Sequence, residues 1–104
     1  MKIVASSLHF YTLAYEREVV WANAVESAGQ YALLRLEDES GAVGVAEGTI
    51  KSTWSGVSPR SLAAALEDVL LPRLTGVECA GPQGVLQCLA GIPENRLARA
   101  LIEQ

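Results

Sequence analysis

The sequence contains few of the cysteine and histidine residues on which most metal sites and many nucleophilic sites depend. Its 104 residues include two cysteines and a single histidine, His9. The spacing of Cys79 and Cys88 matches no metal-binding motif, and two cysteines do not build a disulfide framework. We therefore expect two reduced thiols that pack as small hydrophobic side chains, which favours a cytoplasmic location. His9 lies mid-strand in the pattern below, where a structural role is favoured over catalysis, and His, Asp and Glu do not cluster as metal ligands.

Positive charge and long apolar runs are also scarce. Eight Lys and Arg stand against twelve Asp and Glu, for a net charge of -4, and the basic residues are scattered. A protein that neutralises nucleic-acid phosphates needs a basic stripe, so nucleic acid is not an expected partner. No apolar run approaches the roughly 20 residues of a membrane span, and the N-terminus lacks the continuous apolar segment of a signal peptide.

The chain is nevertheless apolar for its size. Half of its residues are hydrophobic and 19% are charged, and the mean hydropathy is +0.23. A domain of this length has a large surface for its volume and should need more polar coverage. We expect one face to be covered by another domain or subunit, with a tightly folded monomer as the alternative.

The first half of the chain predicts a three-stranded antiparallel meander. Strands are expected near 2–13, 30–38 and 42–49, where apolar residues alternate with polar ones. The segment 38–41 ends in Gly41 and is typical of a tight turn. In the third strand, Val43, Val45 and Glu47 share one face.

The second half predicts helices. Ser58 is an N-cap with Pro59 at the first helical position, and Leu71, which precedes Pro72, is biased out of the helix and closes it. Its core-facing side chains are Leu62, Leu66, Val69 and Leu70. A short helix is expected over 82–90 and a final one from Pro93 to the end. The fold class is therefore α+β, a meander followed by about three helices.

The final helix has a start signal but no stop signal. Leu97, Ala98, Leu101 and Ile102 form one apolar stripe, and no Gly, Asn or Pro follows it. We expect residues 1–104 to be one domain cut from a longer protein.

Two loops are expected at one end of the sheet, because the exits of the first and third strands of a meander share an edge. The first, 14–29, contains Trp21 and Arg17, and the second, 50–57, contains Trp54 and Lys51. Large aromatic side chains beside a cation suit the binding of an organic acid. The alternative is that both tryptophans pin their loops to the domain's own core.

Glu47 is the one carboxylate with a candidate role. It stands at the end of the third strand, where it projects toward the two loops or pairs with Arg35 or Lys51. The residues do not make a complete catalytic constellation.

The order of these elements resembles a known family. The hairpin 33–47, the helix end 70–76 and the terminal segment 99–104 are similar to the N-terminal capping domain of the enolase superfamily, in its mandelate racemase and muconate lactonizing branch. The resemblance spans essentially the whole chain. One departure is Ala46, where the family often has Gly in a Gly-x-Gly-Glu pattern.

The resemblance implies a two-domain enzyme in which this domain is a lid over a modified TIM barrel. Barrel carboxylates would hold Mg²⁺, which stabilises an enediolate while barrel residues abstract a proton α to a carboxylate. None of those residues is in this chain, so the chain alone is expected to supply no catalytic group and no metal ligand. Its implied partners are the missing barrel and a small carboxylate substrate. By position, the substrate-facing residues are Tyr15, Arg17 and Trp21 in the first loop, and Lys51, Thr53 and Trp54 in the second.

Two other functions are open at this stage. The chain is alternatively a free-standing α+β module that binds a partner protein, or a small self-contained enzyme that uses Glu47 and His9. If a barrel-facing surface is bare, the isolated domain should self-associate or bind a hydrophobic dye in its folded state.

Overall fold

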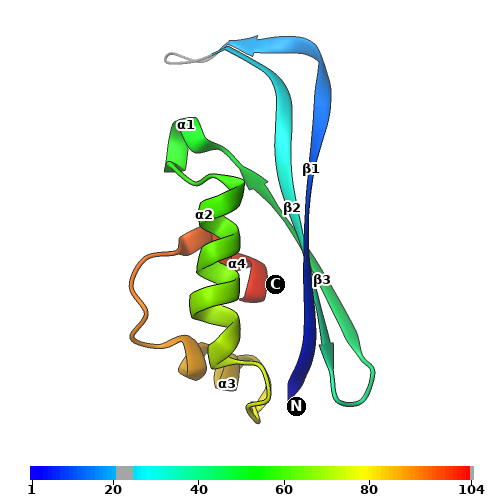
Figure 1. Cartoon of the computed structure of the whole chain (residues 1–104), viewed down its shortest axis with the longest axis vertical. Helices are drawn as coiled ribbons and strands as arrows, with labels where there is room; N and C mark the ends of the chain where they lie inside the picture. The colour runs from blue at the N-terminus through cyan, green and yellow to red at the C-terminus, as the bar shows by residue number, and fades with distance from the viewer. Residues whose placement is uncertain (21–24, 104) are drawn as a thin grey trace.

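The computed structural model describes residues 1–20 and 25–103. The chain forms an antiparallel sheet in the order β1-β2-β3 and then a set of helices (Figure 1). The strands are β1 (Ile3–Val20), β2 (Val25–Asp38) and β3 (Val43–Ile50). The helices are α1 (Ser52–Ser55), α2 (Pro59–Ala64), α3 (Gly81–Leu89) and α4 (Arg96–Glu103); α2 continues through η1 (Ala65–Leu70) and η2 (Leu71–Arg73). The predicted α+β class and meander are confirmed.

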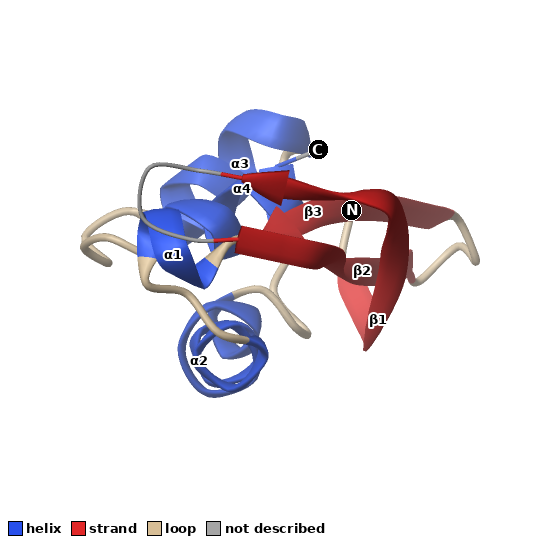
Figure 2. Cartoon of the chain, turned by 90° about the horizontal axis from the view of Figure 1, so that it is seen from above, coloured by secondary structure: helices blue, strands red, loops and turns tan. Residues whose placement is uncertain are grey.

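The helices lie on one side of the sheet, and the alternation predicted for the strands decides which side (Figures 1 and 2). Leu34 of β2 is paired with Leu8 of β1 and Ala46 of β3. Leu34 and Ala46 are buried, whereas Val45, the residue just before Ala46 in β3, is 60% exposed. One face therefore carries the core. We call the other, which points away from the helices, the open face.

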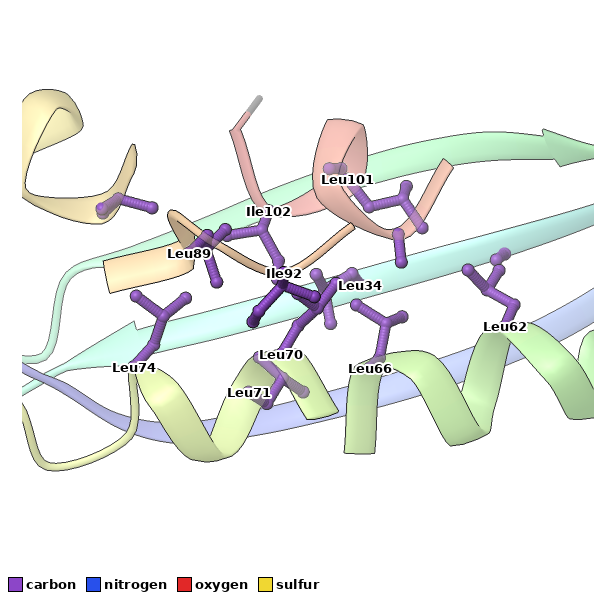
Figure 3. Packing of buried hydrophobic residues seen from close by; sticks show 14 of the residues in the cluster. Leu34, Leu62, Leu66, Leu70, Leu71, Leu74, Leu89, Ile92, Leu101 and Ile102 are labelled. Atoms are coloured by element: carbon purple, nitrogen blue, oxygen red, sulfur yellow. The ribbon is translucent and has the colours of Figure 1, made fainter. Parts of the chain in front are cut away.

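The long helix contributes leucines to this core, but not with the predicted spacing. Leu62, Leu66 and Leu70 are buried beneath β2 (Figure 3). In η1 the N–H of Leu71 donates to the carbonyl of Leu66, five residues earlier. This wider turn leaves Val69 42% exposed, so its predicted place in the core is wrong.

The helix also does not close before Pro72. Leu71 keeps right-handed helical angles, φ −62° and ψ −36°, and is buried. Pro72 follows within the short 3₁₀ segment η2, which ends the helix at Arg73.

The final helix starts later than predicted. Glu94 and Asn95 have positive φ values of 58° and 56°, which stop Pro93 from serving as its first residue. The guanidinium of Arg99 donates to the carbonyl of Ile92 at 2.7 Å and ties the helix to this turn.

β1 and β2 run far beyond β3, which corrects the predicted loop over 14–29. Residues 15–20 and 25–28, here called the arm, form a two-stranded ribbon with a register shift between Ala14 and Val19 (Figure 1). The arm gives the molecule a radius of gyration of 15.2 Å, against about 13 Å for a compact domain of this length. The accessible surface of the chain is 6528 Å², against about 5,700 Å² expected for a compact protein of this mass.

Among the described residues, none of the helices is long and apolar enough to cross a membrane.

Candidate functional site

The arm and α1 lie at the same end of the molecule, as the strand topology predicted (Figure 1). The predicted second loop contains α1, a single helical turn that ends at Gly56, where φ is +72°. The N–H of Gly56 donates to the carbonyl of Ser52 and that of Ser55 to Lys51, so this turn is fixed by its own backbone.

An ion pair joins these two segments. The ammonium of Lys51, at the start of α1, donates to the Glu26 carboxylate on the arm at 2.9 Å. Both side chains are mostly shielded, with 21% and 18% of their surfaces exposed. A pair with this little solvent around it is screened less than a surface pair. The two segments are therefore coupled electrostatically.

A hollow of about 250 Å³ lies beside this ion pair. The lining residues are Thr12, Glu26, Ser27, Ala28, Gly29, Gln30, Ile50, Lys51 and Ser52. Its walls thus come from the base of the arm, the end of β3 and the start of α1. Hydroxyl, amide and charged groups line it, which suits a small polar ligand or part of one.

The other predicted residues of the two segments are distributed as follows. Tyr15 is half-buried on the arm and Arg17 is exposed on it. Trp21 lies outside the described residues. Thr53 and Trp54 belong to α1, of which the backbone alone is described at these two positions. The structure brings Lys51 against the arm that carries Tyr15 and Arg17.

Glu47 lies elsewhere, on the open face of the sheet. It accepts a hydrogen bond from the Tyr11 hydroxyl. This bond raises the pKa of Tyr11 to about 12, because it favours the protonated phenol beside a carboxylate. Neither partner predicted for Glu47 is used: Arg35 pairs with Glu37 at 3.3 Å, and Lys51 pairs with Glu26.

A stacked tyrosine pair braces the sheet next to Glu47. The rings of Tyr11 and Tyr31, directly opposite each other in the register, lie 5.3 Å apart between centroids at an interplanar angle of 21°. The Tyr31 ring also covers Gly29, whose backbone is buried at the base of the arm. Cross-strand aromatic pairs stabilise a sheet, so this cluster has a structural role beneath the arm.

Sequence reasoning missed Glu26. In the structure β2 begins at Val25, so Glu26 lies on this strand beyond its last pair with β3, Gln30 with Ile50, and Lys51 directly follows Ile50. The predicted strand boundary at residue 30 placed Glu26 in a loop of unknown course and hid that relationship.

A second, larger groove of about 950 Å³ lies between the first turns of α2 and α4. Its apolar lining residues include Leu62, Ala65, Leu97 and Ala98, and its polar ones include Ser61, Glu94 and Arg96.

The described residues do not fit a metal site. Within 1–20 and 25–103, His, Cys, Asp and Glu side chains nowhere gather in a group of three or more that could hold a metal ion.

No family model and no curated protein matches the sequence. Solved structures do match it. They include the L-Ala-D/L-Glu epimerase of Bacillus subtilis, with 26% identity and a TM-score of 0.87, and a muconate lactonizing enzyme of Mycobacterium smegmatis, with 26% identity and a TM-score of 0.85. An N-succinyl Arg/Lys racemase of Bacillus cereus matches with 24% identity and a TM-score of 0.87.

These matches cover 99% of this chain in each case, but only 29%, 28% and 28% of the three enzymes. The chain thus spans less than a third of the length of the enzymes it resembles. The resemblance predicted from the sequence is confirmed: the fold of this chain is similar to the N-terminal domain of enolase-superfamily enzymes of the mandelate racemase and muconate lactonizing type.

Proposed function

We propose that this chain is the substrate-capping domain of a Mg²⁺-dependent racemase, epimerase or cycloisomerase of the enolase superfamily. In this proposal a C-terminal barrel domain completes the enzyme, which works in the cytoplasm and abstracts a proton α to the carboxylate of a small substrate. The capping domain contributes no catalytic group of its own.

The observation that carries the proposal is the joined pair of segments at one end of the sheet. The arm extends beyond the domain's own core, and Lys51 links it to α1 through Glu26. Val20 and Val25 near the end of the arm are 74% and 61% exposed. Apolar side chains held out on a ribbon, away from their own core, are suited to cover another surface.

The coverage of the matched enzymes gives independent support. Epimerases, racemases and cycloisomerases align over 99% of this chain, and about 70% of their own length lies outside the match.

The chain's groups fit a role in binding rather than in catalysis. Arg17 supplies a cation that can orient a carboxylate, and the exposed valines of the arm can exclude water from a closed site.

The proposal is tested with the protein encoded by the complete reading frame. It is incubated with Mg²⁺ in deuterated water with a panel of dipeptides and N-acyl amino acids, and α-proton exchange is followed by mass spectrometry. We expect exchange with the complete protein and none with residues 1–104 alone. Exchange catalysed by the isolated chain would contradict the proposal.

A variant pair then tests the lid. Arg17→Ala should raise KM about tenfold for the accepted substrate, because a charge-assisted hydrogen bond contributes roughly 1.5 kcal/mol or more. Arg73→Ala, which removes an exposed arginine of η2 at the other end of the helix layer, should leave KM unchanged. Equal effects of the two substitutions would show that the arm does not contact substrate.

The free-standing interaction module is the second candidate. Val43 and Val45, on the open face of the sheet, are 47% and 60% exposed. That face could seat a partner protein without any barrel. This alternative predicts a reading frame that encodes no barrel and a protein that exchanges no α-protons.

A further inference from the structure

Two cysteines that the proposed function does not use meet at the end of the domain away from the arm. The Sγ atoms of Cys79 and Cys88 lie 3.6 Å apart, as free thiols in contact. Cys79 belongs to residues 75–79, here called the strap, which runs beside the start of β1. Cys88 belongs to the last turn of α3.

The backbone holds this pair together from both sides. The N–H of Cys79 donates to the carbonyl of Met1 at 2.7 Å, and the strap is bridged to β1 at Thr75 and Glu78. On α3, a Cβ added at Gly84 would lie 3.1 Å from the Cys79 carbonyl carbon. A glycine at this position lets the strap approach the helix closely.

Gly84 also determines which face of α3 packs against the strap. Gly84 and Cys88 are four residues apart on α3 and so lie on one face of it, one turn from each other. The close approach at Gly84 therefore brings the Cys88 side chain against Cys79. A disulfide needs an S–S distance of about 2.05 Å. Small rotations of two side chains already in contact can supply the remaining approach.

The two thiols differ in access. Cys79 is 2% exposed, and burial, followed by the hydrogen bond with Cys88, raises the pKa of its thiol. Cys88 is half-buried. An oxidant from solvent thus reaches Cys88 first, and Cys79 stands ready as the second thiol.

We propose that Cys79 and Cys88 are a redox-sensitive pair, which a hydroperoxide converts to an intramolecular disulfide that ties the strap to α3. The Cys88 thiolate attacks the peroxide, the O–O bond breaks, and Cys88 becomes a sulfenic acid with release of hydroxide. The Cys79 sulfur then attacks the Cys88 sulfur, the S–O bond breaks, and water leaves. Two thiols lose two electrons and two protons in total, and the peroxide is reduced to water.

The disulfide should stabilise the domain without reaching the arm. It closes a short loop that contains α3 and fixes the strap, which in turn holds Met1 and the start of β1. In the cytoplasm the pair would remain reduced until peroxide rises, which agrees with the thiols expected from the sequence.

The test uses the 104-residue chain, first reduced and then treated with a small excess of hydrogen peroxide. Thiols titrated under denaturing conditions should fall from two to none. The tryptic peptide 74–96, which contains both cysteines, should lose the mass of two hydrogens. The chain should stay monomeric on a non-reducing gel, and its melting temperature should rise by about 5 °C and return to the starting value on reduction.

Two variants separate the roles of the thiols. In native protein, the remaining thiol of Cys79→Ser should react with a solvent-borne disulfide reagent at least about tenfold faster than that of Cys88→Ser, because burial and a raised pKa both slow Cys79. Cys88→Ser removes a half-buried side chain and should remain folded. Thiols that survive peroxide, a sulfinic acid on Cys88 with a free Cys79, or disulfide-linked dimers would each overturn the proposal.

Discussion

The ammonium of Lys51 donates a hydrogen bond to the Glu26 carboxylate at 2.9 Å and so joins α1 to the arm. The two residues are 25 positions apart in the chain; Glu26 belongs to β2, and Lys51 directly precedes α1. Because both side chains are mostly shielded from solvent, the movements of α1 and of the arm should be coupled. The two parts of the proposed lid are thereby held as one unit.

Breaking this pair should loosen that unit. We expect Glu26→Gln to lower the free energy of unfolding by about 1 kcal/mol, because a partly shielded ion pair becomes a hydrogen bond from the charged ammonium to a neutral amide. Amide hydrogen exchange should become several-fold faster over residues 51–56. The control is Glu18→Gln, which removes an exposed carboxylate from the same arm and should change neither quantity. Exchange that is equally fast in both variants would mean that the pair does not couple the segments.

A side chain at Gly29 should displace the ring of Tyr31. A Cβ at this position would lie 2.5 Å from the Tyr31 hydroxyl oxygen and 2.8 Å from ring carbons of Tyr31. We expect Gly29→Ala to push this ring off Tyr11 and to lower the free energy of unfolding by about 1–3 kcal/mol, measured by urea denaturation. Gly44→Ala is the matched control, because a Cβ there meets nothing within 4 Å. The account of the tyrosine pair is wrong if the two substitutions cost the same.

The turn between β2 and β3 should respond to acid through Asp38. The Ser40 hydroxyl donates to its carboxylate at 2.6 Å, and the N–H groups of Ala42 and Ser40 add to this effect, so the pKa of Asp38 is held below its ordinary value. A carboxyl with a lowered pKa in the folded state stabilises that state above its unfolded pKa, near 4, and the stabilisation is lost as pH falls through the folded value.

We expect Ser40→Ala to raise the pKa of Asp38, since it removes the largest of these contributions. The measurement is a pH titration of the carboxyl carbon by NMR. Ser27→Ala, an exposed serine on the arm, serves as the control and should leave the titration unchanged. An Asp38 pKa that does not rise in Ser40→Ala would contradict this account of the turn.

The exposed valines of the arm should make the isolated chain bind a hydrophobic dye while it is folded. We expect Val25→Thr to reduce this binding, because Val25 is 61% exposed on the arm. Val69→Thr should reduce it less, since Val69 is a single exposed side chain, 42% accessible, on the long helix. Dye fluorescence at a temperature well below the melting point measures both effects. A folded monomer without dye binding would argue against a bare docking surface.

The sequence predicted the strand faces because burial follows their alternation. Leu34 and Ala46 fall on the covered face for this reason. The arm was missed because a ribbon beyond the core has no buried side, and Glu16, Arg17 and Glu18 show no alternation. Strand length therefore could not be read past residue 13.

The predictions for the helices were wrong where the local backbone departs from a regular α-helix. Val69 was placed in the core from a spacing that the wider turn at Leu71 changes. The last helix was started at Pro93, but Glu94 and Asn95 adopt left-handed angles that a sequence pattern does not reveal.

Within the candidate site, the strand topology correctly predicted that the arm and α1 lie at the same end of the sheet. It did not predict the partners of Lys51 and Glu47. The Lys51 pair depends on the course of the arm, and the Glu47 bond depends on the register that sets Tyr11 and Tyr31 side by side. Both are long-range consequences of strand pairing. The predicted substrate-binding roles stay predictions for all seven residues, Tyr15, Arg17, Trp21, Glu47, Lys51, Thr53 and Trp54.

The most direct test of the central claim is to sequence the source gene past the codon for Gln104. We predict that the reading frame continues through successive strand–helix units, with lysine and then acidic residues at consecutive strand ends, as a barrel that holds Mg²⁺ requires. The arm and α1 would then be the two segments to vary for substrate specificity. A stop codon directly after Gln104 would contradict the account and leave the free-standing module in its place.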